Sequence, residues 1–162
     1  MTPLRSFLCV AFGCAVLSVG LAAAAEPASA DLDVRQVTPE DAVVALRAVA
    51  GARNVAVVDE DTVRVSGTPE ELAVASVVVE LLELPTDTAE QVTARVLADD
   101  SHVARVVLRH ASTSDVVLAL RAKIGISRFA VNAPTATILV RDTQEQVRAA
   151  LDLIAAMERE GS

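Results

Sequence analysis

Two stretches of this sequence repeat the same pattern, and this repeat is its most constraining feature. Residues 41–48 match residues 115–122 at an offset of 74, and the same offset pairs Gly51 with Gly125. Further along, residues 63–70 match residues 138–145 at an offset of 75, so one inserted residue aligns residues 41–70 with residues 115–145. A period of this kind indicates one supersecondary unit used more than once. The chain is therefore expected to fold as two similar units in tandem.

Each copy reads as β-α-β-β-α. In the second copy, a valine-rich strand precedes a helix that stops at Gly125, and two short strands flank a turn before a last helix that Thr143 caps. Pro39 and Pro69 stand in the first turns of the two helices of the first copy, where proline is best tolerated. A small three-stranded sheet with two helices on one face buries its apolar side under those helices. The predicted fold class is α+β, two tandem β-α-β-β-α modules.

The pattern sets the module boundaries. The first module covers residues 31–85 and the second covers residues 102–160, with a connector at 86–101 in which the alternation of residues 91–97 allows an extra strand. The first module's last helix, 69–84, carries apolar residues well beyond one stripe, which is typical of a helix buried on more than one side. It either packs between the two modules or offers a partner surface.

The first residues predict export. Met1–Arg5 carries a positive charge, an apolar run follows to Leu21, and two A-x-A patterns then allow cleavage after Ala25 or Ala30. Residues 1–25 therefore form a predicted signal peptide, and the expected location is the periplasm or cell envelope. Both cysteines lie in this segment, so the mature chain has no thiol. No later stretch is apolar enough for a transmembrane span.

Composition argues against nucleic acid and against catalysis. The formal net charge is −8, and the chain has no Tyr or Trp to stack on bases. His102 and His110 flank one predicted strand, too far apart to share a metal ion. The acidic pairs fall in predicted turns or at helix starts, where they have structural reasons to occur. We expect no enzyme activity, no cofactor, no metal site and no nucleic-acid partner.

The second copy resembles the secretin N-domain, the small periplasmic module of type II and type III secretion and type IV pilus secretins. The resemblance rests on Val106–Ser112, Leu120-Arg121, Asn132–Ile138, Val140–Thr143 and Leu153-Ile154. It implies a non-enzymatic assembly module, with a secretin or a second copy of the chain as protein partner. The secretin barrel domain is missing here, so a ring component or adaptor is expected. The stretch from Asp61 to Leu72 is also similar to the lipid-associated BON module, which leaves envelope lipid as the alternative.

Strand alternation predicts a partner face on the open side of the second module's sheet. Four arginines with two apolar residues between them would form a basic, partly apolar patch, and arginine is enriched at protein interfaces. The predicted patch consists of Arg105, Val107, Arg109, Arg128, Leu139 and Arg141. An acidic edge of the first module, Glu71, Glu80 and Glu83, is a possible counterpart. A merely solvated sheet face is the other interpretation.

Overall fold

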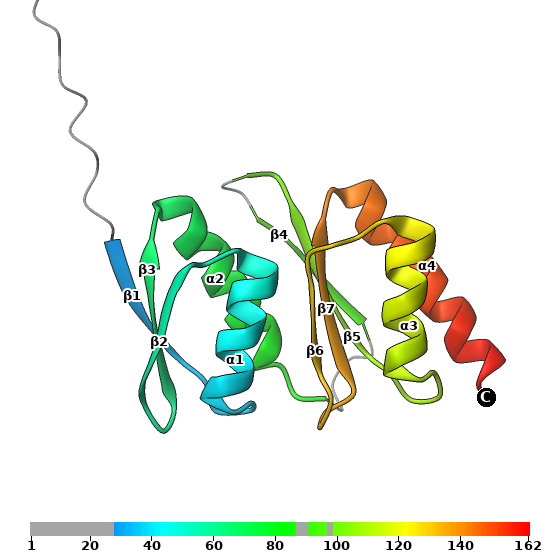
Figure 1. Ribbon diagram of the computed structural model, residues 1–162, viewed down its shortest axis with the longest axis horizontal. Coiled ribbons are helices and arrows are strands. Elements are labelled where there is room, and N and C mark those ends of the chain that lie inside the picture. The colour runs from blue at the N-terminus through cyan, green and yellow to red at the C-terminus, as the bar shows by residue number, and fades with distance from the viewer. Residues whose placement is uncertain (1–27, 87–90, 97–98) are drawn as a thin grey trace, which may run out of the picture.

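The strands and helices form two α+β modules in tandem (Figure 1). The computed structural model describes residues 28–86, 91–96 and 99–162. The predicted signal peptide, residues 1–25, lies outside the described residues. The first module contains β1 (Ala28–Asp33), α1 (Pro39–Ala45), the π-helical turn η1 (Leu46–Ala50), β2 (Asn54–Asp59), β3 (Thr62–Gly67) and α2 (Pro69–Leu82). The second contains β4 (Gln91–Arg95), β5 (His102–Val107), α3 (Thr113–Ala119), the π-helical turn η2 (Leu120–Ile124), β6 (Phe129–Asn132), β7 (Thr137–Asp142) and α4 (Gln144–Glu160).

Both sheets are antiparallel. The first has the strand order β1-β3-β2 and the second has the order β4-β5-β7-β6. The second sheet therefore gains a fourth strand from the connector, where the alternation of residues 91–97 left an extra strand open; residue 97 itself lies outside the described residues. β1 begins before the expected residue 31, because Ala28 pairs with Gly67 and Ala30 with Val65. A cut after Ala30 would remove half of this strand.

Local side chains explain where the helices begin and end. Thr38, Thr68 and Thr143 each accept a hydrogen bond from a backbone N–H in the first turn of α1, α2 and α4. The first helix of each module ends in a π-helical turn followed by a glycine with positive φ, +75° at Gly51 and +81° at Gly125. Glycine adopts this left-handed conformation without steric cost, so it terminates the helix in both modules.

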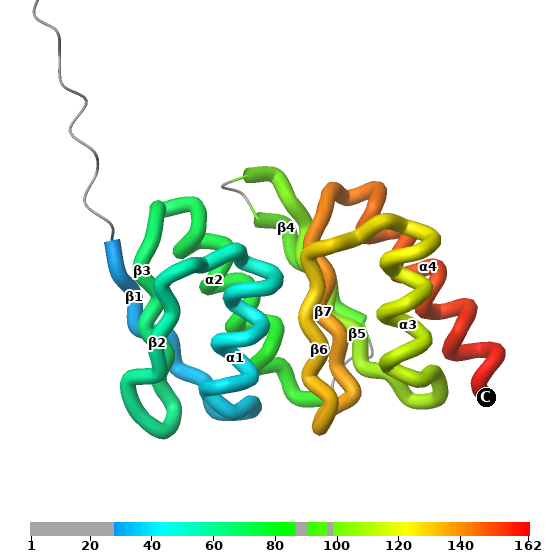
Figure 2. Tube along the Cα trace, viewed as in Figure 1, coloured from blue at the N-terminus to red at the C-terminus, as the bar shows by residue number. Residues whose placement is uncertain are grey.

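The elements stack in four layers, and α1 and α2 lie between the two sheets (Figure 2). Helices α3 and α4 cover the far face of the second sheet. The inner layer explains why α2 is apolar on several sides, since it buries Val74, Ala75, Val78, Val79, Leu81 and Leu82. The helix thus packs between the modules. Among the described helices, none combines the length and apolarity that crossing a membrane requires.

The apolar core of the first module continues into the second sheet. One cluster of buried residues joins the first module's strands and helices to Val96, Val103, Ala130 and Leu139, whereas a second cluster lies between the second sheet and α3 and α4. The two modules therefore do not have separable cores. Removing the first module would expose one whole face of the second sheet.

Candidate functional site

The predicted basic face is not open. Arg105 and Leu139 are each 2% exposed and Arg141 is 6% exposed, because α1, η1 and α2 of the first module cover this side of the sheet. Val107 is half-buried, and Arg109 and Arg128 are exposed. The alternation of the strands identified which side chains share a face, but the expectation that this face is free is wrong. Its three central residues bind the first module of the same chain.

Arg141 joins the two modules. Its Nη1 donates hydrogen bonds to the carbonyl oxygens of Val49 (2.9 Å) and Ala50 (3.1 Å), at the end of η1. Its Nε donates to the Ser101 hydroxyl (3.0 Å), and its Nη2 pairs with the Asp99 carboxylate. A helix end leaves carbonyls without partners. Arg141 satisfies two of these carbonyls and therefore has a structural role.

The predicted acidic counterpart is largely occupied within its own module. The Glu71 carboxylate accepts the backbone N–H of Thr68 (2.9 Å) in the capping box of α2. The Glu83 carboxylate accepts the backbone N–H groups of Arg35 (2.8 Å) and Gln36 (3.1 Å). Glu80 is exposed. No ion pair between described residues joins these three carboxylates to the arginines of the second module.

Glu158 has the same role in the second module as Glu83 in the first, because each carboxylate accepts backbone N–H groups of a loop. Its carboxylate accepts the backbone N–H groups of Arg109 (3.2 Å), His110 (3.0 Å) and Ala111 (3.0 Å), which holds the loop after β5 against the end of α4. Burial alone would raise the pKa of Glu158, but these N–H groups and the nearby His110 outweigh it and hold the pKa below its ordinary value. Glu83 and Glu158 are 75 residues apart, the offset of the repeat, and this spacing is the signal that could have revealed both roles.

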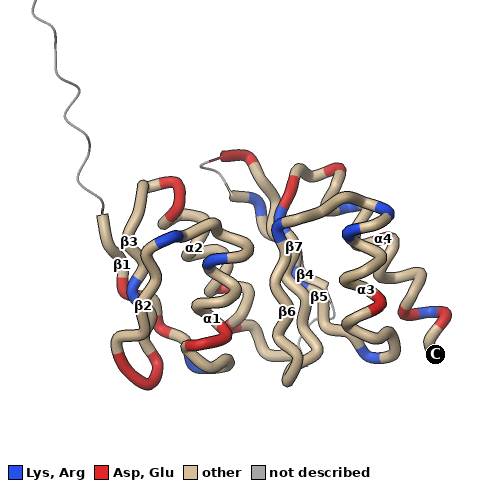
Figure 3. Tube along the Cα trace, in the orientation of Figure 1, with Lys and Arg blue, Asp and Glu red and all other residues tan. Residues whose placement is uncertain are grey.

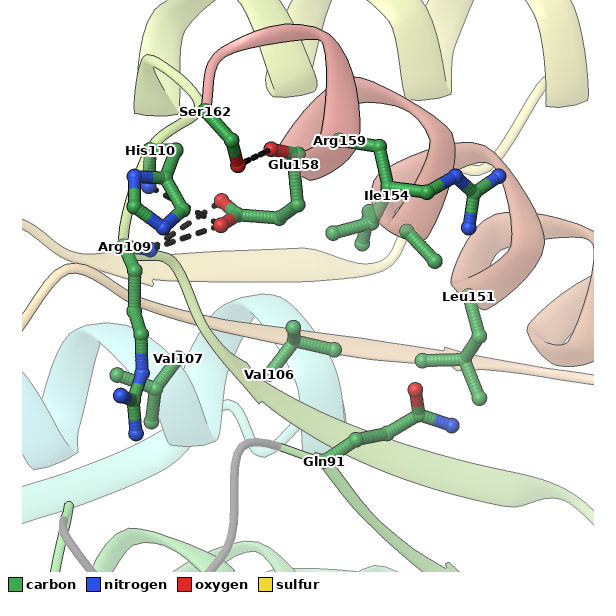
Figure 4. A pocket seen from close by; sticks show the side chains of 11 residues that line it. Gln91, Val106, Val107, Arg109, His110, Leu151, Ile154, Glu158, Arg159 and Ser162 are labelled. Carbon is green, nitrogen blue, oxygen red and sulfur yellow. Dashed lines mark hydrogen bonds between the residues drawn. The ribbon is translucent and has the colours of Figure 1, made fainter.

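A groove lies beside this carboxylate, between α4 and the strand pair β4–β5 (Figure 4). Its volume is about 310 Å³. Apolar side chains form one part of it, and they are Val106, Leu151, Ile154 and Ala155. Charged and polar groups stand at one end, where Figure 4 shows the Glu158 carboxylate directed at the backbone of Arg109 and His110. A second hollow at the other end of β4 is lined by Arg95, Asp99, Asp100, His102, Thr143 and Gln144.

The strand that borders the groove is an edge strand. Among the described strands, β4 pairs with β5 alone, so one side of its backbone has no strand partner. Val92 and Ala94 pack toward the core between the modules, whereas Gln91, Thr93 and Arg95 are exposed. An edge strand next to an apolar groove can accept an extended polypeptide, since backbone hydrogen bonds provide affinity and the groove receives alternate side chains.

The two histidines and the acidic residues that the structure describes do not gather in one place. Within the described residues, no group of three His, Cys, Asp or Glu side chains could hold a metal ion. His102 is half-buried near the start of β5, and His110 lies beyond its other end, next to Glu158.

Charge is distributed unevenly between the modules (Figure 3). Residues 28–86 hold eleven acidic and four basic side chains, whereas residues 99–162 hold eight of each. The groove thus belongs to the nearly neutral module, and its apolar residues are not surrounded by charge of one sign.

No family model matches the sequence, and no curated protein matches it significantly. Solved structures of secretin domains are similar to the chain at low identity. The N-terminal domain of the secretin XcpQ from Pseudomonas aeruginosa is 13% identical with a TM-score of 0.33, over 78% of this chain and 61% of that one. The extra-membranous domain of the secretin HofQ from Actinobacillus actinomycetemcomitans is 15% identical with a TM-score of 0.31, over 82% of this chain and 96% of that one. The chain thus spans less than two thirds of the XcpQ structure, and at these TM-scores the likeness says nothing of partners or assembly.

Proposed function

We propose that this chain is a non-enzymatic assembly module of the cell envelope that binds an extended segment of a protein partner along β4. The partner belongs to a secretin-type secretion or type IV pilus system, in which the chain serves as a component or adaptor. The observation that carries the proposal is the edge strand β4 beside the groove of α4. The signal-peptide pattern of residues 1–25 supports the envelope location, and the secretin-like sequence pattern of the second module supports the type of machine.

Each part of the groove has a role in this binding mode. The free edge of β4 would pair with the partner's backbone, and alternate partner side chains would enter between Val106 and Leu151. Ala155 keeps the groove open, because a larger residue at this position on α4 would fill it. The Glu158 end, which holds its own loop, limits how far an apolar segment extends.

Site-specific photo-crosslinking in cells tests the proposal. A photoreactive residue in place of the exposed Thr93 should crosslink to one protein of the envelope, a secretin or another copy of this chain. Ala155→Arg should abolish the crosslink because it blocks the groove. Ala149→Arg, on a half-buried position of α4 that does not line the groove, is the matched control and should leave it intact.

Two results would contradict the proposal. One is a crosslink that persists unchanged in the folded Ala155→Arg variant, since the groove would then not contribute. The other is co-flotation of the purified protein with liposomes together with no protein crosslink, which is the outcome that the BON-like alternative predicts.

A further inference from the structure

Two arginines are buried between the modules, and only one of them has its charge balanced among the described residues. Arg141 makes the ion pair with Asp99 and three further hydrogen bonds. Arg105 is the more buried of the two at 2% exposure, yet among the described residues its one hydrogen bond is a long one, from Nη1 to the carbonyl oxygen of Pro85 at 3.4 Å. Its Nε is buried and has no acceptor in the part of the chain that the structure describes.

An uncompensated guanidinium in such a place is costly. Moving a charge out of water is expensive unless it is paired and hydrogen-bonded, and buried charges in proteins are therefore paired almost without exception. Burial lowers the pKa of Arg105, and no charge within residues 28–86, 91–96 and 99–162 opposes the effect. An arginine nevertheless stays protonated at neutral pH, so the positive charge remains and requires a counter-charge.

The Arg105 side chain borders a cavity of about 100 Å³ in the seam between the modules. Its apolar lining includes Leu82 and Leu84, and the hydroxyl-bearing Thr135 and Thr137 also line it. Exposed Gln36 and Thr86 mark where it reaches solvent. A water molecule occupies about 30 Å³ in the liquid, so the space admits a group larger than one water.

We propose that this cavity is an oxyanion-binding site, in which Arg105 donates to the oxygens of a carboxylate or phosphate group. The planar guanidinium fork matches the two oxygens of such a group, and the pairing supplies both the acceptor and the negative charge that Arg105 does not receive from the described residues. The site goes beyond the proposed function, because it lies between the modules and not in the groove of α4. An anion bound there stabilises the docked arrangement of the two modules.

Thermal unfolding of the purified mature chain tests the proposal, with sodium acetate and inorganic phosphate as probes and sodium chloride at matched ionic strength as reference. A ligand that binds the native state raises Tm with its concentration. Above the dissociation constant, each tenfold increase in the oxyanion concentration should raise Tm by roughly 3–5 °C beyond chloride. Arg105→Met should lose this rise, and Arg128→Met, at an exposed position of the same module, should keep it.

Stability in chloride alone gives an independent readout. Since Arg105→Met removes an unbalanced charge and retains an apolar stem, its Tm without oxyanion should equal or exceed that of the wild type. Arg105→Lys, which keeps the charge but not the fork, should bind the oxyanion more weakly than wild type. A blocked glutamyl peptide distinguishes the source of the group: binding as tight as acetate indicates an acidic side chain, and weaker binding indicates a free anion.

Three results would overturn the assignment. They are no rise in Tm beyond chloride for the wild type in either oxyanion, an equal rise in Arg105→Met, and a large loss of stability of Arg105→Met in chloride. The last would mean that the charge already has a partner within the chain.

Discussion

Replacing Arg141 by methionine should weaken the contact between the two modules and lower the free energy of unfolding. Methionine keeps an apolar stem of similar length, so the change mainly removes the guanidinium. Its loss leaves the carbonyls of Val49 and Ala50 without the donors that now lie at 2.9 and 3.1 Å, and removes the pairing with Asp99. Hydrogen bonds to charged groups contribute about 1.5–3 kcal/mol each and are not additive. A buried acceptor left unsatisfied costs about 1–3 kcal/mol, so with two such carbonyls we expect a loss of about 3–5 kcal/mol.

Urea denaturation followed by circular dichroism measures this loss. Small domains lose about 1–3 kcal/mol of unfolding free energy per molar urea, so the midpoint should fall by roughly 2 M. Because native stability is about 5–15 kcal/mol, the variant remains folded in buffer. Arg128→Met is the matched control, since Arg128 is exposed and a surface substitution changes stability by about 0.5 kcal/mol or less.

The contribution of Asp99 can be separated from that of the carbonyls. Asp99→Asn should cost less than 1 kcal/mol, because the Asp99 side chain is 29% exposed whereas that of Arg141 is 7% exposed. If Arg141→Met shifts the midpoint no more than Arg128→Met does, the seam is not held by this arginine and the reasoning fails. A shift fully reproduced by Asp99→Asn would assign the energy to the ion pair instead.

Three further predictions concern the chain as a whole. Glu158→Gln should lower stability by about 1–2 kcal/mol at neutral pH, because a neutral amide replaces a charged acceptor of three backbone N–H groups. The Glu158 pKa lies below the ordinary glutamate value of 4.5, so its contribution to stability is complete above that pH and is lost as the pH falls through the lowered value. Glu158→Gln should therefore flatten the acid limb of a stability–pH curve, and an unchanged limb would contradict the cause assigned here. Gly125→Ala should cost about 1–2 kcal/mol in thermal unfolding although nothing lies within 4 Å of the added Cβ, since the penalty comes from its positive φ; an unchanged Tm would refute this. Intact-mass measurement should find a mature chain that starts at Glu26, because a start at Asp31 would remove half of β1. A mature chain that retains Met1 would contradict the prediction of export.

The elements of the fold follow from local patterns in the sequence. Thr68 and Thr143 begin helices because their side chains accept the N–H groups that every helix start leaves free. Gly51 and Gly125 end helices because a positive φ costs glycine nothing. Alternation likewise placed Arg105 and Arg141 on one face of a strand pair. Contacts between residues close in sequence suffice for all of these, so the α+β class and the tandem modules could be predicted.

The candidate site required tertiary structure. Glu158 reaches backbone groups 47 to 49 residues away, and the groove exists only because β4 joins the second sheet beside α4. The spacing of Glu83 and Glu158 in the repeat was visible, but the spacing alone does not say what the two carboxylates bind. A groove depends on the distance between elements, which no local pattern of apolar residues encodes.

Side chains at corresponding strand positions are exposed in the first module and buried in the second. Asp31 and Arg64 form an exposed ion pair on the first sheet, whereas Arg105 and Leu139, cross-strand partners at the corresponding positions of the second, are buried under α1 and α2. The sequence by itself determined which side chains share each face, because the two-residue period of a strand is a local property. Only the tertiary structure decided which face is covered, because coverage depends on the docking of one module against the other, through contacts such as the one from Arg141 to Val49 across 92 residues of sequence.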